Sequence, residues 1–277
     1  MWVTEAMNGF GMTVEVEAEL CRRQSKFQKI ELYQTGKLGK LLLLDGIIQL
    51  TDFDEFAYHE MLANLPMFAH ENPRRALVIG GGDGGILREL GKHPGLEVMD
   101  ICEIDEEVIK VAREFLPEIS CGYDDPRVKI HIADGSEFVK EKPGYYDVII
   151  VDSTDPGGPG APLFGETFYR DMKKALRPGG VIATQAESPY LLPDIVARLN
   201  RVSRSIFRSV GYASIMVPTY PTGMIGACVA SDRDDVTVPA RPVPPELQKR
   251  LRYYNAAIHH AAFQVPTFVS RLFEQNR

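Results

Sequence analysis

The chain has 277 residues, of which 44% are hydrophobic and 25% charged, a composition typical of a folded globular protein and not of a disordered one. Its 31 basic and 38 acidic residues give a net charge of -7, which argues against a nucleic-acid-binding surface and is compatible with cationic partners. The N-terminus has no signal-peptide pattern and no apolar run is long enough to span a bilayer, so we expect a cytoplasmic protein without a membrane partner.

Residues 1–55 are predicted to form a small antiparallel β domain. Glycines at 36, 39 and 46 separate β-rich segments, and Asp45-Gly46 is a strong tight-turn signal. A helix is expected from about Asp54 to Ala69. Its apolar face is expected to consist of Phe56, Met61, Leu62 and Leu65.

After this helix the pattern alternates between strands and helices, which predicts a doubly wound, mainly parallel sheet over residues 56–277. Short runs rich in valine and isoleucine occupy residues 75–81, 97–105, 128–135 and 146–153. Residues 106–116 have helical spacing. The segments 211–221 and 223–231 are expected to pair as a late hairpin that borders the sheet. The predicted class is therefore α/β, with a Rossmann-like domain that follows a small β domain.

A glycine-rich turn, GGGDGG at residues 80–85, follows the first strand of this region and leads into a helix. Gly80, Gly82 and Gly85 satisfy G-x-G-x-x-G, a turn whose amides usually bind phosphate. Asp83 lies inside the turn, and a carboxylate directed at a pyrophosphate would weaken binding. We therefore expect either that Asp83 faces away or that the ligand is not a dinucleotide.

Acidic residues fall at the ends of the first four expected parallel strands. They are Asp83, Glu103, Asp134 and Asp152. Because ligands of open parallel sheets bind outside the carboxyl ends of the strands, these four side chains are expected at one edge. An acid about 20 residues beyond the glycine turn commonly binds ribose hydroxyls, which suits Glu103. Asp134 and Gly135 could contact an adenine amine or could simply form a turn.

The position of Asp83 separates the candidate nucleoside ligands. S-adenosylmethionine has both an ammonium and a carboxylate on its tail, so an aspartate would attract one and repel the other. Decarboxylated S-adenosylmethionine carries only the ammonium, so the carboxylate is attractive throughout.

Six motifs in this order resemble the polyamine aminopropyltransferase family, and most closely its spermidine-forming members. They are DEFAYHEM at 54–61, GGGDGG at 80–85, EID at 103–105, VDSTDPGGPGAPLF at 151–164, TYPTG at 219–223 and RYYNAAIHHAAF at 252–263. The resemblance implies an N-terminal β-stranded domain before a methyltransferase-like Rossmann domain. It also implies decarboxylated S-adenosylmethionine as co-substrate, no cofactor or metal, and a homodimer or homotetramer.

Carried over by position, the resemblance implies that Asp152 is the catalytic residue. The residues implied to bind the donor or methylthioadenosine are Gln28, Gln49, Asp83, Glu103, Asp134, Gly135 and Pro159. Those implied to bind the polyamine are Tyr58, His59, Asp83, Asp152, Asp155, Gln185 and Tyr220.

The implied reaction moves an aminopropyl group from the donor to a diamine, with putrescine expected as acceptor and spermidine and methylthioadenosine as products. The acceptor amine must lose a proton before it attacks, and Asp152 is the expected general base. Two alternatives remain at this point: an S-adenosylmethionine-dependent methyltransferase of the same fold, and a non-catalytic module that binds polyamines or nucleosides.

Overall fold

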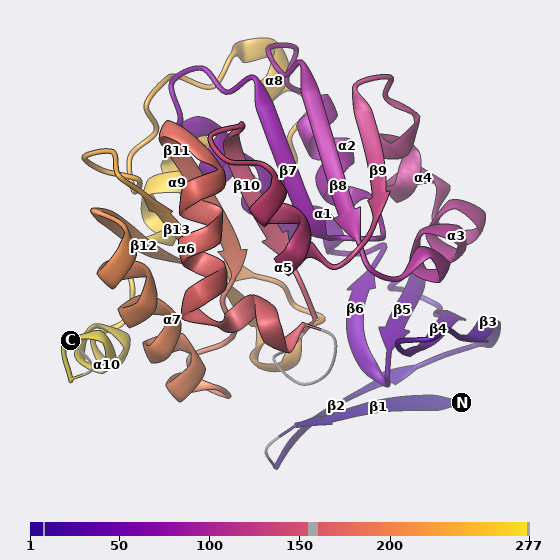
Figure 1. Cartoon of the computed structure of the whole chain (residues 1–277). Coiled ribbons are helices and arrows are strands. Elements are labelled where there is room, and N and C mark those ends of the chain that lie inside the picture. The colour runs from indigo at the N-terminus through magenta and orange to yellow at the C-terminus, as the bar shows by residue number, and fades with distance from the viewer. Residues whose placement is uncertain (8, 155–159, 276–277) are drawn as a thin grey trace.

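The computed structural model describes residues 1–7, 9–154 and 160–275. Figure 1 shows a central sheet with helices on both faces and two small antiparallel sheets below the edge at which the parallel strands end. This arrangement confirms the predicted fold class. Within the described residues, no helix is both long enough and apolar enough to cross a bilayer.

The N-terminal region forms two sheets and not one. The first is a hairpin of β1 (Trp2–Met7) and β2 (Phe10–Glu15). The second is a four-stranded antiparallel meander of β3 (Ala18–Gln24), β4 (Lys29–Gln34), β5 (Lys40–Leu44) and β6 (Ile47–Thr51). Asp45 and Gly46 join β5 to β6 with φ values of 50° and 82°, the positive angles that a tight hairpin turn requires.

The central sheet has seven strands in the order β12-β13-β11-β10-β7-β8-β9. Its parallel strands are β7 (Arg75–Gly80), β8 (Val98–Glu103), β9 (Val128–Ile132), β10 (Tyr146–Asp152) and β11 (Leu176–Gln185). The expected late hairpin is present as β12 (Ser209–Met216) and β13 (Met224–Ser231), which joins the sheet antiparallel to β11.

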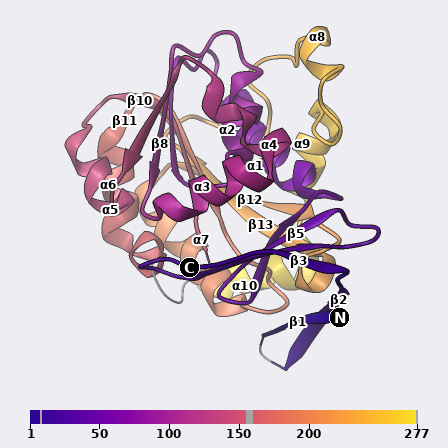
Figure 2. The same cartoon turned by 90° about the vertical axis from the view of Figure 1, so that its right-hand side faces the viewer.

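The described helices cover the sheet in two layers (Figures 1 and 2). On one face lie α1 (Glu55–Ala69), α2 (Gly85–Gly91) and α9 (Ala256–Ala262). On the other face lie α5 (Gly135–Phe138), α6 (Glu166–Ala175) and α7 (Pro193–Ile206). The remaining α-helices are α3 (Glu106–Phe115), α4 (Pro117–Ser120), α8 (Pro245–Gln248) and α10 (Thr267–Gln275). Short 3-10 helices span Cys121–Asp124, Val139–Glu141, Ala161–Phe164 and Pro221–Gly223.

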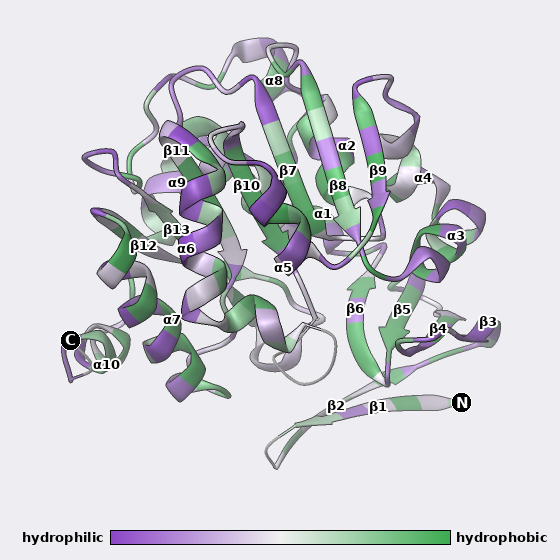
Figure 3. Ribbon diagram, viewed as in Figure 1, coloured by the Kyte–Doolittle hydropathy of each residue, from purple (hydrophilic) through white to green (hydrophobic). Residues whose placement is uncertain are grey.

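Hydrophobic packing explains why the strands form the centre of the molecule. Figure 3 shows β7 and β10 as largely hydrophobic, and their alternate residues contribute to the cores on opposite faces. Val78 packs into the core with α1 and α2, whereas Ile79 packs into the core with α6 and α7. A strand buried on both faces reads as a continuous apolar run, which is the pattern seen in the sequence.

Helix α1 is buried on all sides, and of its fifteen residues only Phe56 is not buried. The sequence had indicated a single apolar face, because polar residues occupy the remaining positions. These polar residues have specific partners: both carboxylate oxygens of Glu60 accept hydrogen bonds from the backbone amides of residues 252–254, each at 2.8 Å. Asn64 bonds to His93 at 2.9 Å. Buried polar groups in these positions are stable because each is hydrogen-bonded.

Candidate active site

The site lies between β7 and β10, where the order in which the chain adds strands to the sheet reverses. Gly80 at the end of β7 pairs with Asp152 at the end of β10, and the amide of Gly81 donates to the Asp152 carbonyl oxygen at 2.9 Å. Gly80 has a φ of 78°, and a Cβ there would lie 2.1 Å from that carbonyl oxygen. Only glycine allows this close approach, which brings the glycine turn against the end of β10.

Two adjoining pockets open at this edge. The glycine-turn pocket is lined by residues 80–83 together with Gln28, Glu103, Asp134 and Gly135. The tyrosine pocket is lined by Tyr58, His59, Gln185 and Tyr220, among others. Five residues line both pockets and form a shared wall: Gln49, Asp83, Asp152, Ser153 and Thr154. Two ligands bound in these pockets would therefore meet at Asp83 and Asp152.

Asp152 lies at the centre of this wall and accepts a hydrogen bond from the Tyr58 hydroxyl at 2.6 Å. Burial, together with the nearby carboxylate of Asp83, raises the pKa of Asp152 to about 6. Burial and the charge of Asp152 raise the pKa of Tyr58 well above its ordinary value, so Tyr58 remains a neutral donor. A carboxylate whose pKa is raised toward neutrality is a better proton acceptor than an ordinary aspartate.

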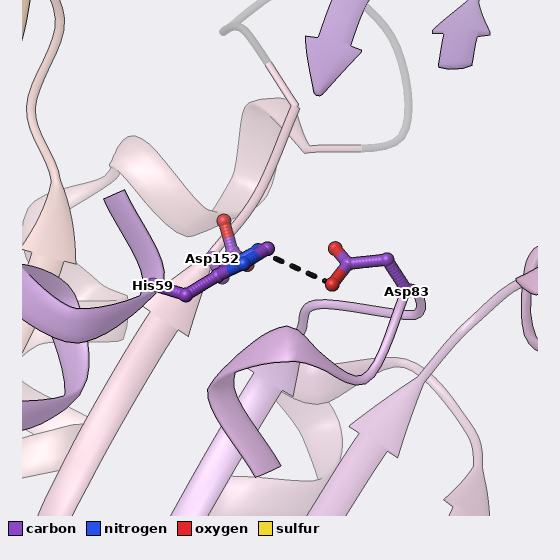
Figure 4. Close-up of side chains that lie close together, drawn as sticks. All are labelled: His59, Asp83 and Asp152. Carbon is purple, nitrogen blue, oxygen red and sulfur yellow. Dashed lines mark ion pairs between the residues drawn. The ribbon is translucent and has the colours of Figure 1, made fainter. Parts of the chain in front are cut away.

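His59 lies between two carboxylates. Its Nδ1 is 2.6 Å from Glu55 Oε2, and its Nε2 is 3.2 Å from Asp83 Oδ1, the ion pair drawn in Figure 4. Burial disfavours a charged ring, but Asp83 and Glu55 outweigh it and raise the pKa of His59 to about 10. Asp83 Oδ1 also accepts a hydrogen bond from the Gly85 amide at 2.6 Å, at the start of α2.

Glu55 is held in turn by Arg88 of α2. The guanidinium donates to both carboxylate oxygens, at 3.0 Å and 2.7 Å, which is the bidentate geometry preferred for such pairs. Burial disfavours the Glu55 carboxylate, but His59 and Arg88 lower its pKa to about 2. Neither Glu55 nor Arg88 was singled out from the sequence, although Glu55 precedes His59 by one helical turn.

His59, Asp83 and Asp152 bring potential metal-ligating atoms within 4.8 Å of one another. A histidine binds metal through the lone pair of a neutral ring nitrogen. Both ring nitrogens of His59 face carboxylates, and a ring that donated to both of them would offer a metal ion no lone pair. The trio therefore suits an ammonium group better than a metal ion.

The glycine-turn pocket contains Glu103 at the end of β8. Burial raises its pKa to about 7, and its Oε1 accepts the Asp105 amide at 2.8 Å. Gln28 of the N-terminal region donates from Nε2 to Asp105 Oδ2 at 3.0 Å. These bonds connect the four-stranded sheet to the pocket wall.

Asp134 caps a helix and also lines the glycine-turn pocket. Its Oδ1 accepts from the backbone amide of Ser136 at 2.8 Å, at the start of α5. Gly135 packs closely on Ile79, since a Cβ there would lie 2.2 Å from the Ile79 side chain.

In the tyrosine pocket, the rings of Tyr58 and Tyr220 lie 6.0 Å apart, and the Tyr220 hydroxyl donates to the Gln49 carbonyl at 2.6 Å. Gln185 donates from Nε2 to Glu187 Oε1 at 3.0 Å. Its buried Oε1 has no hydrogen-bond partner among the described residues. That oxygen is available to a donor group of a ligand.

Two expected site residues, Asp155 and Pro159, fall outside the residues that the structure describes. Two acids that sequence reasoning missed, Glu5 and Glu187, line the tyrosine pocket and are buried. Glu5 comes from β1, more than fifty residues before Tyr58, and no local pattern marks it. Glu187 has a φ of 60°, unusual for a residue other than glycine, which the sequence did not signal.

The chain is similar to spermine and spermidine synthases over most of its length. The model of the spermine/spermidine synthase domain matches residues 55–240, and that of the spermidine synthase tetramerisation domain matches residues 1–52. Spermidine synthase 1 of Hyoscyamus niger is 46% identical over 275 residues, which cover 96% of this chain and 87% of that protein. Spermine synthase of Arabidopsis thaliana is 43% identical over 280 residues, which cover 98% and 77%. A crystal structure of spermidine synthase in complex with the transition-state analogue AdoDATO superposes with a TM-score of 0.94 at 39% identity and covers 99% of this chain and 95% of that one.

Proposed function

Because the chain belongs to the spermine/spermidine synthase family and is a polyamine aminopropyltransferase, we propose that it transfers the aminopropyl group of decarboxylated S-adenosylmethionine to putrescine. The products are spermidine and methylthioadenosine. The observation that carries this proposal is the pair of adjoining pockets whose shared wall holds Asp83 and Asp152.

The donor occupies the glycine-turn pocket in this proposal. Glu103 binds the ribose hydroxyls, and Gln28, Asp134 and Gly135 complete the nucleoside site. Asp83 lies on the shared wall, where its carboxylate attracts the ammonium of the aminopropyl tail. The same carboxylate would repel the tail carboxylate of S-adenosylmethionine, which favours the decarboxylated donor.

The acceptor diamine occupies the tyrosine pocket, with one amine at Asp152 and the other toward the acids at the far side. Tyr58 and Tyr220 supply aromatic walls for the methylene chain, and Gln49 adjoins the reacting end. Glu5, Glu187 and the free Oε1 of Gln185 form a polar region for the remote ammonium. Two cationic ends separated by an apolar chain match this arrangement.

In the reaction, the lone pair of the acceptor nitrogen attacks the methylene next to the sulfonium. The new C–N bond forms as the C–S bond breaks, and methylthioadenosine leaves as a neutral thioether. Before this attack the acceptor ammonium gives one proton to Asp152, which frees the lone pair, and after it the nitrogen is a secondary ammonium that keeps its two protons. The raised pKa of Asp152, near 6, favours this transfer, while Tyr58 orients the carboxylate through its 2.6 Å hydrogen bond.

His59 contributes to the amine-binding wall through Asp83, and the reaction needs no metal in this proposal. The tetramerisation domain match over residues 1–52 supports a homodimer or homotetramer as the assembled form. We further propose that the N-terminal β domain ends near residue 55, where α1 begins. The alternatives of a methyltransferase and of a non-catalytic binding module have no support from the comparisons.

An acceptor panel tests the proposed function. The protein is incubated with decarboxylated S-adenosylmethionine and putrescine, cadaverine, agmatine or spermidine, with and without a chelator, and products are measured by mass spectrometry. Putrescine should give the highest kcat/KM and equal amounts of spermidine and methylthioadenosine, and the chelator should change nothing. Asp152→Asn should lower kcat by about 100-fold or more with little change in donor affinity. A higher kcat/KM with spermidine would instead assign spermine formation, and near-normal turnover of the variant would exclude Asp152 as the base.

A further inference from the structure

We propose that Glu55 is a positioning residue that, clamped by Arg88, keeps His59 as an imidazolium whose Nε2–H holds Asp83 at the wall shared by the two pockets. The catalytic consequence rests on the proposed function, in which Asp83 binds the ammonium of the donor. The protonation of His59 is independent of that function and can be measured separately.

The geometry at His59 carries this inference. One ring nitrogen lies 2.6 Å from Glu55 Oε2 and the other 3.2 Å from Asp83 Oδ1, so the ring joins two carboxylates. A neutral imidazole has one N–H and one lone pair, and it could donate to only one of them. The other nitrogen would then direct its lone pair at a carboxylate oxygen. The doubly protonated ring is the form that satisfies both contacts.

The ring cannot turn away from these partners. Its side chain is only 3% exposed, and it packs against the start of α2, where a Cβ on Gly85 would lie 2.2 Å from His59 Cε1. The Tyr58 ring meets it edge-on at a centroid distance of 5.7 Å. A change in the protonation of His59 therefore alters its contact with Asp83 while its rotamer stays the same.

Glu55 is fixed from its far side. Arg88 spans both of its oxygens, and the same guanidinium donates from Nε to Glu89 Oε1 at 3.0 Å. Among the described residues that line the two pockets, neither Glu55 nor Arg88 occurs. The direct side-chain connection from Glu55 to these pockets is His59, which lines the tyrosine pocket.

The charged and titratable groups that face His59 come from each element packed against it. Helix α1 contributes Glu55 and Tyr58, the glycine turn contributes Asp83, β10 contributes Asp152, and Arg88 of α2 lies behind Glu55. Among the described residues, three carboxylates thus lie close to the ring, and Arg88 offsets the charge of one of them. Removal of one carboxylate is expected to lower the pKa of His59 by about 1 to 3 from its value near 10.

The wild-type protein tests the protonation directly. Its histidine side chains are labelled with ¹⁵N, and the His59 signals are assigned by their loss in His59→Gln. At pH 8 both ring nitrogens should give the shifts of an imidazolium, and the neutral form should appear only as the pH approaches 10. A neutral tautomer at pH 8 would overturn the proposal.

Glu55→Gln tests the catalytic consequence, because glutamine keeps the size and can accept from Nδ1–H but removes the charge. The matched control is Glu89→Gln, which removes the other carboxylate bound by Arg88 but does not touch His59. For Glu55→Gln, the donor KM should rise about tenfold over wild type at pH 9.5, where the ring of the variant is neutral and its contact with Asp83 is no longer charge-assisted. At pH 6, where the ring is protonated again, the difference should fall to about twofold, with kcat affected less than KM throughout.

Glu89→Gln should show no pH-dependent change in donor KM relative to wild type. If the two variants changed the donor KM equally, Glu55 would have a purely structural role. The same would follow if the rise in donor KM for Glu55→Gln were as large at pH 6. Failure of the proposed function would appear differently: methylthioadenosine would not form with putrescine in the wild type, while the ¹⁵N shifts would still report the charge on His59.

Discussion

The carboxylate of Asp83 has three partners: the Gly85 amide, the His59 ring and, in the proposed complex, the ammonium of the donor. Asp83→Asn keeps an oxygen that can accept from Gly85, so the glycine turn should survive. The charge-assisted contact to the ammonium is lost, which should weaken decarboxylated S-adenosylmethionine by about 1.5 to 3 kcal/mol. Isothermal titration should show this loss, with methylthioadenosine, which lacks the tail, binding almost unchanged.

S-adenosylmethionine provides the internal control for that substitution. Its tail carboxylate is repelled by Asp83, so Asp83→Asn should narrow the gap in affinity between it and the decarboxylated donor. Equal losses of affinity for all three ligands would mean that Asp83 only shapes the turn.

Individual site residues differ in how readily the sequence indicates them. Asp83 and Asp152 follow strands, and the rule that parallel strands end at one edge was enough to predict that they lie together. Glu5 and Glu187 could not be found in this way, because Glu5 reaches the site from a separate hairpin and Glu187 through a backbone with positive φ. Such positions depend on tertiary packing that no local pattern records.

At the scale of elements, the start of α2 packs tightly against α1, and this gives opposite predictions for two glycines in one helix. A Cβ on Gly85 would lie 2.2 Å from His59 Cε1, whereas a Cβ on Gly91 would meet nothing closer than Asp125 Oδ2 at 3.4 Å. Gly85→Ala should therefore lower the free energy of unfolding by about 1 to 3 kcal/mol through overpacking. Gly91→Ala should raise it by up to about 1 kcal/mol, because alanine is the better helix former.

Denaturant unfolding of the two variants and wild type checks this prediction. Gly85→Ala should also raise the donor KM, since it displaces His59 from Asp83. If the two alanine variants had the same stability, the close contact between α1 and α2 would not limit the packing here.

The elements themselves were well predicted where periodicity was strong. The first four parallel strands and the hairpin of β12 and β13 were found from apolar runs, and the Asp45-Gly46 turn from its residues. The sequence predicted helix α1 but not its burial on all sides. Polar residues such as Glu55, Glu60 and Asn64 are usually exposed to solvent, but here they are buried. Their partners are distant in sequence, so their burial is a property of the assembled molecule.

At the scale of the whole molecule, the N-terminal hairpin completes the tyrosine pocket. Glu5 of β1 lines it and accepts the Ile48 amide at 2.9 Å. Glu5→Gln keeps that acceptor and removes a negative charge from the proposed site of the remote ammonium. The putrescine KM should rise about tenfold while the donor KM stays unchanged, as steady-state kinetics would show.

The control is Glu15→Gln on β2, which removes the same charge from an exposed position of the same hairpin. A similar rise in the putrescine KM for both variants would mean that Glu5 acts through long-range electrostatics and not through a contact. A rise in the donor KM alone would mean that Glu5 acts on the glycine-turn pocket and not on the tyrosine pocket.

The three hydrogen bonds from residues 252–254 to Glu60 have a consequence for how the chain is made. Glu60 is synthesised some 190 residues before the amides that satisfy it, and its side chain is only 1% exposed in the finished structure. Until those amides leave the ribosome, burying α1 would leave a carboxylate without partners, which is costly. We therefore expect α1 to reach its final packing only after residues 252–254 have been made, although the helix itself is translated much earlier.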